Sequence, residues 1–380
     1  MANRNQDYTN RIADLNPEDI ETITILKGPE ATSLYGSDGA AGAIVITTKK
    51  GKGGQTKINY TNSFTLSEVY RYPQIQTTYN RGNNGITDYT AYNQANSAYA
   101  AGFPYFGSKY PEGTVMYDNM KNFFQKSFTT QHNLSLEAGT ADFNYRMSAG
   151  YLNANGIVPN TSYQKANVRF SANAKLNKMM TISSTWSYVY STNHKPVKGQ
   201  GSFYTNLLSF PRDMDIREYQ NSDGTRKLLR GLLASDEVDN PLWEANKNYG
   251  IDKNERWTGN TNFTYNIVKG LSFNGILGLD QYSTQGLMFY HPQSKAALTI
   301  GGFIGTYQQI YKGLNGTARL TYRKTIANKF SNDFYAGSYF ENNNSSLNSQ
   351  RGERLLEPTH PSINNTDPTS RDSRLQQFQT

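Results

Sequence analysis

Strict alternation of apolar and polar residues is the feature that most limits how this chain can fold. Residues 164–176 place Val168 and Phe170 in an apolar row, while Lys165, Arg169 and Lys175 all fall in the other row. Side chains of a β-strand point alternately to its two faces, so this pattern predicts a strand with one apolar and one polar face. A register shift of one residue would move every charge to the apolar face.

The same alternation recurs along most of the chain. It predicts strands at 57–66, 128–138, 143–151, 164–176, 180–190, 256–268, 271–283, 306–325 and 330–340. The tail, Glu341 to Thr380, is predicted to be loop.

The connections between these strands alternate in length. Tight turns are expected at Gly139, Asn177, Lys269 and Asn328. Long or medium loops are expected at 67–127, 153–163, 193–255 and 284–305. Outer-membrane barrels have short turns at one end and longer loops at the other, whereas a soluble sandwich has no physical reason to sort its loops in this way.

Composition narrows the class of protein further. The 380 residues include 28 Tyr and no Cys, and the mean hydropathy is −0.71. A disordered polar chain would be poor in aromatic residues, so a folded protein is expected. No apolar run reaches the roughly 18–20 residues of a membrane helix. The net charge of +8 comes from scattered Lys and Arg, so a nucleic-acid partner is not expected.

A different pattern occupies residues 16–51. Asn16 is placed to cap a short helix, and a strand is predicted at Thr22–Leu26. A helix over Glu30–Tyr35 is expected to end at Gly36, and Ala43–Thr48 forms a second apolar strand. The result is a β-α-β unit of about thirty residues, too short in its strands to be part of a barrel wall.

This unit resembles the end of the plug domain in TonB-dependent outer-membrane receptors of the SusC/RagA family. Asp38 and Ala41 depart from the family pattern, which more often has Arg and Asn there. A phosphate-binding loop fits poorly, because the glycines precede a strand and no Gly-Lys-Ser/Thr follows. The matching positions, which form the plug signature, are Asn16, Pro17, Asp19, Ile20, Glu21, Leu26, Lys27, Gly28, Pro29, Ala31, Leu34, Tyr35, Gly36, Gly39, Gly42, Ile46, Thr47, Thr48 and Gly51.

The resemblance implies an all-β fold. A small α+β plug remnant would precede a partial antiparallel transmembrane β-barrel, with about nine strands of a barrel of about 22. Residues 1–54 would be the C-terminal part of the plug domain, and 55–380 the N-terminal part of the barrel with long extracellular loops. Met1 to Arg11 lacks the apolar core of a signal peptide, so the chain is expected to be a truncated reading frame that starts inside a longer protein.

The resemblance also implies a function. It predicts import of a bulky nutrient, an oligosaccharide or a peptide, through a multi-pass β-barrel of the Gram-negative outer membrane. The implied partners are outer-membrane lipid, a SusD-like lipoprotein lid, and the TonB–ExbB–ExbD complex acting through a segment missing from this chain. Two alternatives remain: a soluble or surface-anchored all-β carbohydrate-binding protein or adhesin, and a polysaccharide-active enzyme on a β scaffold.

No catalytic constellation is apparent, so the protein is predicted not to be an enzyme and to need no cofactor or metal. The four histidines lack metal-ligand spacing to one another. A weak calcium site is conceivable at Asp236, Glu237 and Asp239. Asp213 and Asp215 are expected to form ion pairs with neighbouring arginines.

Aromatic residues are common in the predicted loops. They can stack on sugar rings or hold a peptide, although packing against one another is the favoured interpretation. No individual substrate contact can be assigned among Phe103, Tyr105, Phe106, Tyr110, Phe203, Tyr204, Trp243 and Tyr249.

Overall fold

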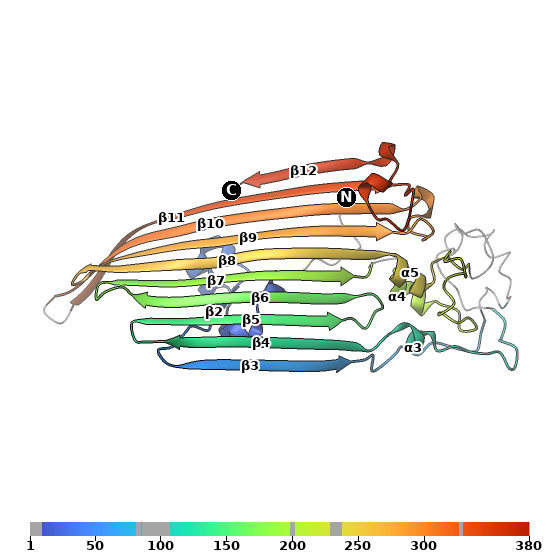
Figure 1. Ribbon diagram of the computed structural model, residues 1–380, viewed down its shortest axis with the longest axis horizontal. Coiled ribbons are helices and arrows are strands. Elements are labelled where there is room, and N and C mark those ends of the chain that lie inside the picture. Colours follow the sequence, from blue (N-terminus) through green and yellow to red (C-terminus); the bar gives the residue numbers. More distant parts are fainter. Residues whose placement is uncertain are drawn as a thin grey trace.

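One large antiparallel sheet dominates the protein in the computed structural model, which describes residues 10–80, 85, 107–197, 202–228, 238–326 and 330–379. Its ten strands lie side by side in sequence order, from β3 at one edge to β12 at the other (Figure 1). The described sheet is therefore an open stretch of wall rather than a closed barrel. Its strands are β3 (Gly54–Ser67), β4 (Ser127–Gly139), β5 (Phe143–Asn155), β6 (Ser162–Lys175), β7 (Met180–Lys195), β8 (Tyr249–Val268), β9 (Leu271–Tyr290), β10 (Phe303–Ile326), β11 (Phe330–Glu353) and β12 (Asp372–Gln379).

Residues 10–51, here called the N-terminal unit, form a separate small element. After the 3-10 turns η1 (Arg11–Asp14) and η2 (Pro17–Asp19), it contains β1 (Ile20–Leu26), α1 (Pro29–Tyr35), the 3-10 turn η3 (Gly36–Gly39) and β2 (Ala43–Thr48). The Asn16 side chain accepts a hydrogen bond from the Glu18 amide, as expected of a helix cap. The expected elements are all present, and β1 and β2 pair antiparallel in a two-stranded sheet.

The two faces of the large sheet differ as the alternation predicts. The face contacted by the N-terminal unit is called the inner face and the opposite one the outer face. Lys165 and Arg169 both contact the N-terminal unit, so the charged row of β6 lies on the inner face. Val168, in the alternate row, is exposed on the outer face. The predicted assignment of the two rows in this strand is confirmed.

The two ends of the sheet also differ. Residues 140–142, 176–179 and 269–270 join successive strands at one end, as predicted, and the expected turn at Asn328 lies outside the described residues. The opposite end has long connections with short helices: α3 (Asn119–Phe123), α4 (Phe203–Leu208) and α5 (Pro241–Lys247) (Figure 1). Among the described residues, no helix is long and apolar enough to cross a membrane.

Several strands extend further toward the loop end than the sequence predicts. β8 begins at Tyr249 rather than Arg256, and β9 continues to Tyr290 instead of ending near Ser283. The prediction of loop after Phe340 is wrong, because β11 continues to Glu353 and β12 follows. That makes ten strands rather than about nine in the described sheet. The added part of β11, residues 341–353, is almost entirely polar and is held by its ladder pairing with β10, so it carries no alternation signal.

Candidate functional site

The N-terminal unit is attached to the inner face by a set of polar contacts that we call the seam. Arg256 of β8 lies at its centre. Its Nη1 donates to Asp14 Oδ2 at 3.0 Å, and its Nε and Nη2 donate to the two carboxylate oxygens of Asp280 on β9, each at 2.9 Å. One guanidinium therefore bridges the N-terminal unit and two wall strands with the paired geometry that arginine favours.

Arg11 makes a second set of contacts near Asp14. Its Nη2 donates to Thr284 Oγ1 at 2.7 Å, and its guanidinium lies 4.1 Å from the ring centroid of Tyr282. Asp14 itself is only 4% exposed and lies 3.7 Å from Arg11. A buried carboxylate of this kind is tolerated only with such counter-charges.

Two further contacts fix the next turn of the N-terminal unit. Arg146 Nη2 donates to Asp19 Oδ1 at 3.3 Å, and both side chains are buried. Asn16 Nδ2 donates to Asn133 Oδ1 at 2.9 Å. Asn16 therefore has two roles, since its oxygen caps the turn while its nitrogen binds the wall.

Gly150 makes room for the Asn16 contact. It lies directly between Asn133 on β4 and Asn167 on β6 in the sheet. A Cβ at Gly150 would lie 2.6 Å from Asn167 Oδ1, 2.8 Å from Asn133 Oδ1 and 2.8 Å from Asn16 Nδ2. Only glycine leaves space for three amide side chains at this point.

Strand β6 contributes two cations to the seam. Lys165 Nζ donates to the carbonyl oxygens of Ala13 at 2.8 Å and Leu15 at 3.1 Å. Arg169 donates through Nη2 to the hydroxyl of Thr48. Because these partners are neutral, both contacts can be broken without separating a charge pair.

A polar cavity of about 300 Å³ lies along the seam between the N-terminal unit and β3–β5. Two buried polar atoms near it, Arg146 Nε and Ser148 Oγ, lack a protein hydrogen-bond partner. A polar space of this size suits several waters. The seam therefore combines specific polar contacts with incomplete packing.

The signature residues have different roles in the structure. Asn16, Asp19 and Thr48 contact the wall directly, whereas Glu21 and Lys27 are exposed. Gly28 and Pro29 begin α1 and Gly36 ends it, so these three residues shape the unit itself. The side chains of Leu34, Tyr35 and Asp38 lie outside the described part. The wall residues of the seam were not predicted as a site, because only their inward row could be inferred from the sequence.

Gly51 marks where the chain leaves the N-terminal unit. A Cβ there would lie 2.4 Å from the backbone carbonyl carbon of Tyr145 on β5. The chain thus crosses β5 in backbone contact just before β3 begins. This close approach explains why the signature ends in glycine.

The loop end forms a second ordered region, the loop cap, built from α3, α4, α5 and their connections. Its core is an apolar cluster that includes Phe123, Leu207, Phe210 and Ile216. Trp243 is fully buried, and its Nε1 donates to Ser294 Oγ at 3.0 Å. Phe203 stacks on Phe123.

Most of the described aromatic residues of the loops pack against other residues of the protein, as the favoured interpretation predicts. Tyr249 stacks on Phe289, and the Tyr110 hydroxyl donates to Asp213 Oδ1 at 3.5 Å. Tyr204 is 48% exposed and remains available for contacts. Phe103, Tyr105 and Phe106 lie outside the described residues.

Asp239 is bound by protein groups rather than left open for calcium. Its Oδ1 accepts from Arg226 at 2.8 Å, and the Lys295 amide donates to both of its oxygens. Burial raises the pKa of Asp239 to about 6 despite these partners. Asp236 and Glu237 lie outside the described residues, within which no group of three His, Asp or Glu side chains is placed to hold a metal.

The predicted ion pairing of Asp215 is confirmed. Arg217 binds both of its carboxylate oxygens, at 2.9 and 3.0 Å through Nε.

The chain is similar in sequence to known TonB-dependent receptors. The family model named TonB-dependent Receptor Plug Domain matches residues 1–43. TonB-dependent receptor SusC of Bacteroides thetaiotaomicron is 34% identical over 170 residues, which cover 44% of this chain and 15% of that protein. TonB-dependent receptor P3 of Formosa agariphila is 24% identical over 321 residues, covering 81% of this chain and 28% of P3.

Solved structures agree with this result. The RagAB peptide importer in its closed-closed state superposes with a TM-score of 0.68 at 17% identity, covering 97% of this chain and 44% of that chain. In its open-open state the TM-score is 0.69 at 16% identity, with the same coverage. The matched part of the chain thus spans 15% and 28% of the two curated relatives. The plug match and the receptor relatives, with the fold shared with RagAB, support the identification of the chain as a fragment of a SusC/RagA-family TonB-dependent receptor.

Proposed function

We propose that the protein imports a bulky solute across the outer membrane, and that the seam is the contact released when the path opens. The observation that carries this proposal is the difference between the two faces of one sheet. The inner face binds the N-terminal unit through buried polar groups, and the outer face exposes apolar side chains to its surroundings. This is the arrangement of a membrane wall with a stopper inside it.

The outer face supports the membrane location. Leu134 and Val168 are each 50% exposed, and a soluble protein rarely leaves such a broad apolar surface uncovered. On β9 the outer row is Leu271, Phe273, Gly275, Leu277 and Leu279. Residues 271–279 match the about nine to eleven residues that a tilted strand needs to cross a bilayer.

The chemistry of the seam supports gating. Apolar packing would hold the N-terminal unit permanently, whereas ion pairs and amide contacts gain little net free energy over hydrated groups. While these ion pairs and amide contacts are intact, they nevertheless hold the N-terminal unit in one position on the sheet. A pull that removes residues 10–16 would expose Asp14, Arg256 and Lys165 to water, and hydration of these charged groups would offset the broken hydrogen bonds.

The domain division proposed here places residues 1–54 in the plug and 55–380 in the barrel wall. The close crossing of Gly51 over β5 supports a boundary at this point, because β3 begins at Gly54. The work done by the protein is binding and gating, without catalysis.

The partners follow from the same proposal. The TonB–ExbB–ExbD complex would supply the pull, and a SusD-like lipoprotein would cover the loop end. The solved relative is described as a peptide importer, which supports a peptide as the solute, and an oligosaccharide is the other candidate.

The test is import in living cells with the protein in its native membrane. Cells should accumulate a labelled peptide or oligosaccharide only when the protein is present and the TonB system is energised. Uptake that persists after TonB is deleted would contradict the gating proposal. Recovery of the protein from the aqueous fraction as a folded monomer would instead favour the soluble binding protein or adhesin.

A further inference from the structure

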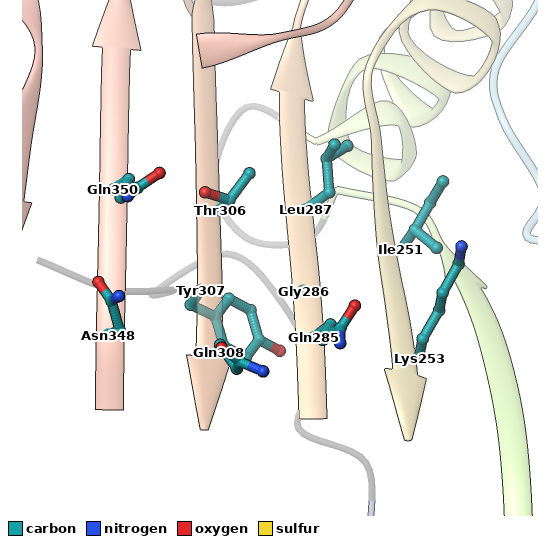
Figure 2. A pocket seen from close by; sticks show the side chains of 10 residues that line it. All are labelled: Ile251, Lys253, Gln285, Gly286, Leu287, Thr306, Tyr307, Gln308, Asn348 and Gln350. Atoms are coloured by element: carbon teal, nitrogen blue, oxygen red, sulfur yellow. The ribbon is translucent and has the colours of Figure 1, made fainter. Parts of the chain in front are cut away.

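We propose that the outer face of β8–β11 carries a docking groove for the phosphorylated oligosaccharide headgroup of an outer-leaflet glycolipid. This inference rests on the proposed location of the wall in the outer membrane. The groove has a volume of about 530 Å³ (Figure 2). It is lined by Ile251, Lys253, Gln285, Leu287, Thr306, Gln308, Asn348 and Gln350, together with Gly286 and Tyr307.

The register places this groove on the face that points away from the N-terminal unit. Lys253, Gln285, Gln308 and Asn348 are direct partners across four neighbouring strands, as Figure 2 shows. Their neighbours Asn254 and Thr284, in the alternate row, contact Arg11 of the N-terminal unit. The groove therefore faces the surroundings of the wall rather than its lumen.

Its height along the strands suits a headgroup. The apolar outer row of β9 ends at Leu279, and Gln285 lies six residues closer to the loop end. At a rise of about 3.3 Å per residue this is roughly 20 Å along a tilted strand. A lipid whose acyl chains lie against Leu277 and Leu279 would hold an extended sugar chain at this level.

The lining is chemically suited to sugars. Four amide side chains, those of Gln285, Gln308, Asn348 and Gln350, are exposed and make no side-chain hydrogen bond within the described part of the chain. Each amide offers donors and an acceptor, a combination that matches sugar hydroxyls. A second cavity of about 570 Å³ continues the groove toward the loop end, sharing Leu287, Thr306 and Gln350.

Charge favours a phosphorylated partner. Lys253 lies inside the groove and Lys312 lies below it on the same outer row, and neither has an ion-pair partner among the described residues. Glu255 is the carboxylate nearest to Lys253 in that row. Arg371 borders the upper cavity, where its Nη2 donates to the carbonyls of Asn364 and Thr366. Asp372 also lines the upper cavity, but it lies 3.8 Å from Arg351 and 3.6 Å from Arg374. The cations Lys253, Lys312 and Arg371 therefore outnumber the carboxylates Glu255 and Asp372, which suits phosphate groups on a sugar backbone.

The test is lipid retention by the protein extracted from its native outer membrane in detergent. Mass spectrometry should find a phosphorylated glycolipid on the wild-type protein. A double variant, Lys253→Gln with Lys312→Gln, should bind purified lipopolysaccharide roughly 10- to 30-fold more weakly. Lys324→Gln is the matched control, because Lys324 lies on the same row of β10 at the turn end and should bind like the wild type.

Three comparisons separate the outcomes. Dephosphorylated glycolipid and phosphatidylglycerol should both bind more weakly than lipopolysaccharide. Equal loss in the double variant and in Lys324→Gln, equal binding of phosphatidylglycerol, or undiminished binding of the dephosphorylated glycolipid would overturn the groove. Membrane insertion without glycolipid retention would refute this inference alone, whereas failure to insert would refute the proposed function.

Discussion

At the scale of single residues, the seam depends on space as much as on charge. Gly150 is the clearest case, since a methyl group there would meet three amide groups at 2.6–2.8 Å. Those amide ends are not free to move away, because Asn16 and Asn133 hydrogen-bond each other.

Gly150→Ala should therefore loosen the N-terminal unit without unfolding the wall. We expect a cost of about 1–3 kcal/mol to the docking of residues 10–20, from steric overlap and a lost buried hydrogen bond. Hydrogen exchange of the η2 amides measures it. Gly275→Ala is the control, because a Cβ there meets only the ring edge of Phe273 at 3.2 Å. Equal protection in both variants would contradict the role given to Gly150.

Arg256 tests the electrostatic part of the seam. Arg256→Gln should leave Asp14 buried without its nearest cation and weaken docking by about 3 kcal/mol. Adding Asp14→Asn should restore part of that loss, because the uncompensated charge is removed. The measurement is limited proteolysis near residues 10–15 in both variants. A double variant that is cleaved faster than the single one would contradict the ion-pair account.

At the scale of elements, α5 in the loop cap contains an unusual acid. Glu244 is 4% exposed, and burial, reinforced by the nearby Asp239 charge, raises its pKa well above the usual value. A carboxyl group with a raised folded-state pKa contributes stability below its unfolded pKa of about 4.5, and that contribution is lost as pH rises through the folded-state pKa.

Glu244→Gln should remove this pH dependence. The variant should stabilise the loop cap at pH 8 and leave it nearly unchanged at pH 4.5, because only the ionised form of Glu244 is disfavoured by burial. Hydrogen exchange of residues 241–247 across this pH range is the measurement. Exposed Glu112 provides the control variant Glu112→Gln. A variant cap that remains pH-dependent to the same extent would show that Glu244 is not the titrating group.

Strand β6 allows a test of the outer face. Val168→Arg places a charge in the middle of the apolar row and should cost about 2–4 kcal/mol of membrane stability, while Leu176→Arg near the turn end should cost about 0–1. Folded yield in the membrane fraction measures both. Equal yields would contradict a lipid-facing row.

The two faces of β6 could be predicted from the sequence, because all charged residues of this strand lie in one row. The sequence could not predict the far part of β11, where Asn342, Asn343, Asn344 and Ser345 are polar on both faces. Such strands form through backbone pairing with β10, which a local pattern does not record.

At the scale of the whole molecule, the sequence singles out residues on one side of the seam only, and it marks them as positions of a motif rather than as contacts to the sheet. Asn16 and Asp19 belong to a recognisable local motif. Their partners, Asn133 and Arg146, lie 117 and 127 residues away. Alternation places Arg146 on the inner row, but nothing local states which inner residue the N-terminal unit meets. That information exists only once the small unit is docked on the sheet.

The most direct test of the account is to lock the seam. The chain contains no cysteine, so Asn16→Cys with Asn133→Cys creates the sole thiol pair in it. In the native protein Asn16 Nδ2 and Asn133 Oδ1 lie 2.9 Å apart. Asn144→Cys with Asn173→Cys is the matched control, since this pair joins β5 to β6 at 3.0 Å and has no hydrogen bond to the described residues of the N-terminal unit.

Both pairs would be joined by oxidation or a short bismaleimide in cells, and TonB-dependent import of the labelled solute would then be measured. The account predicts that joining Asn16→Cys to Asn133→Cys stops import, that reduction of the disulfide restores it, and that the wall pair has no effect. Undiminished import through a fully joined seam would contradict it.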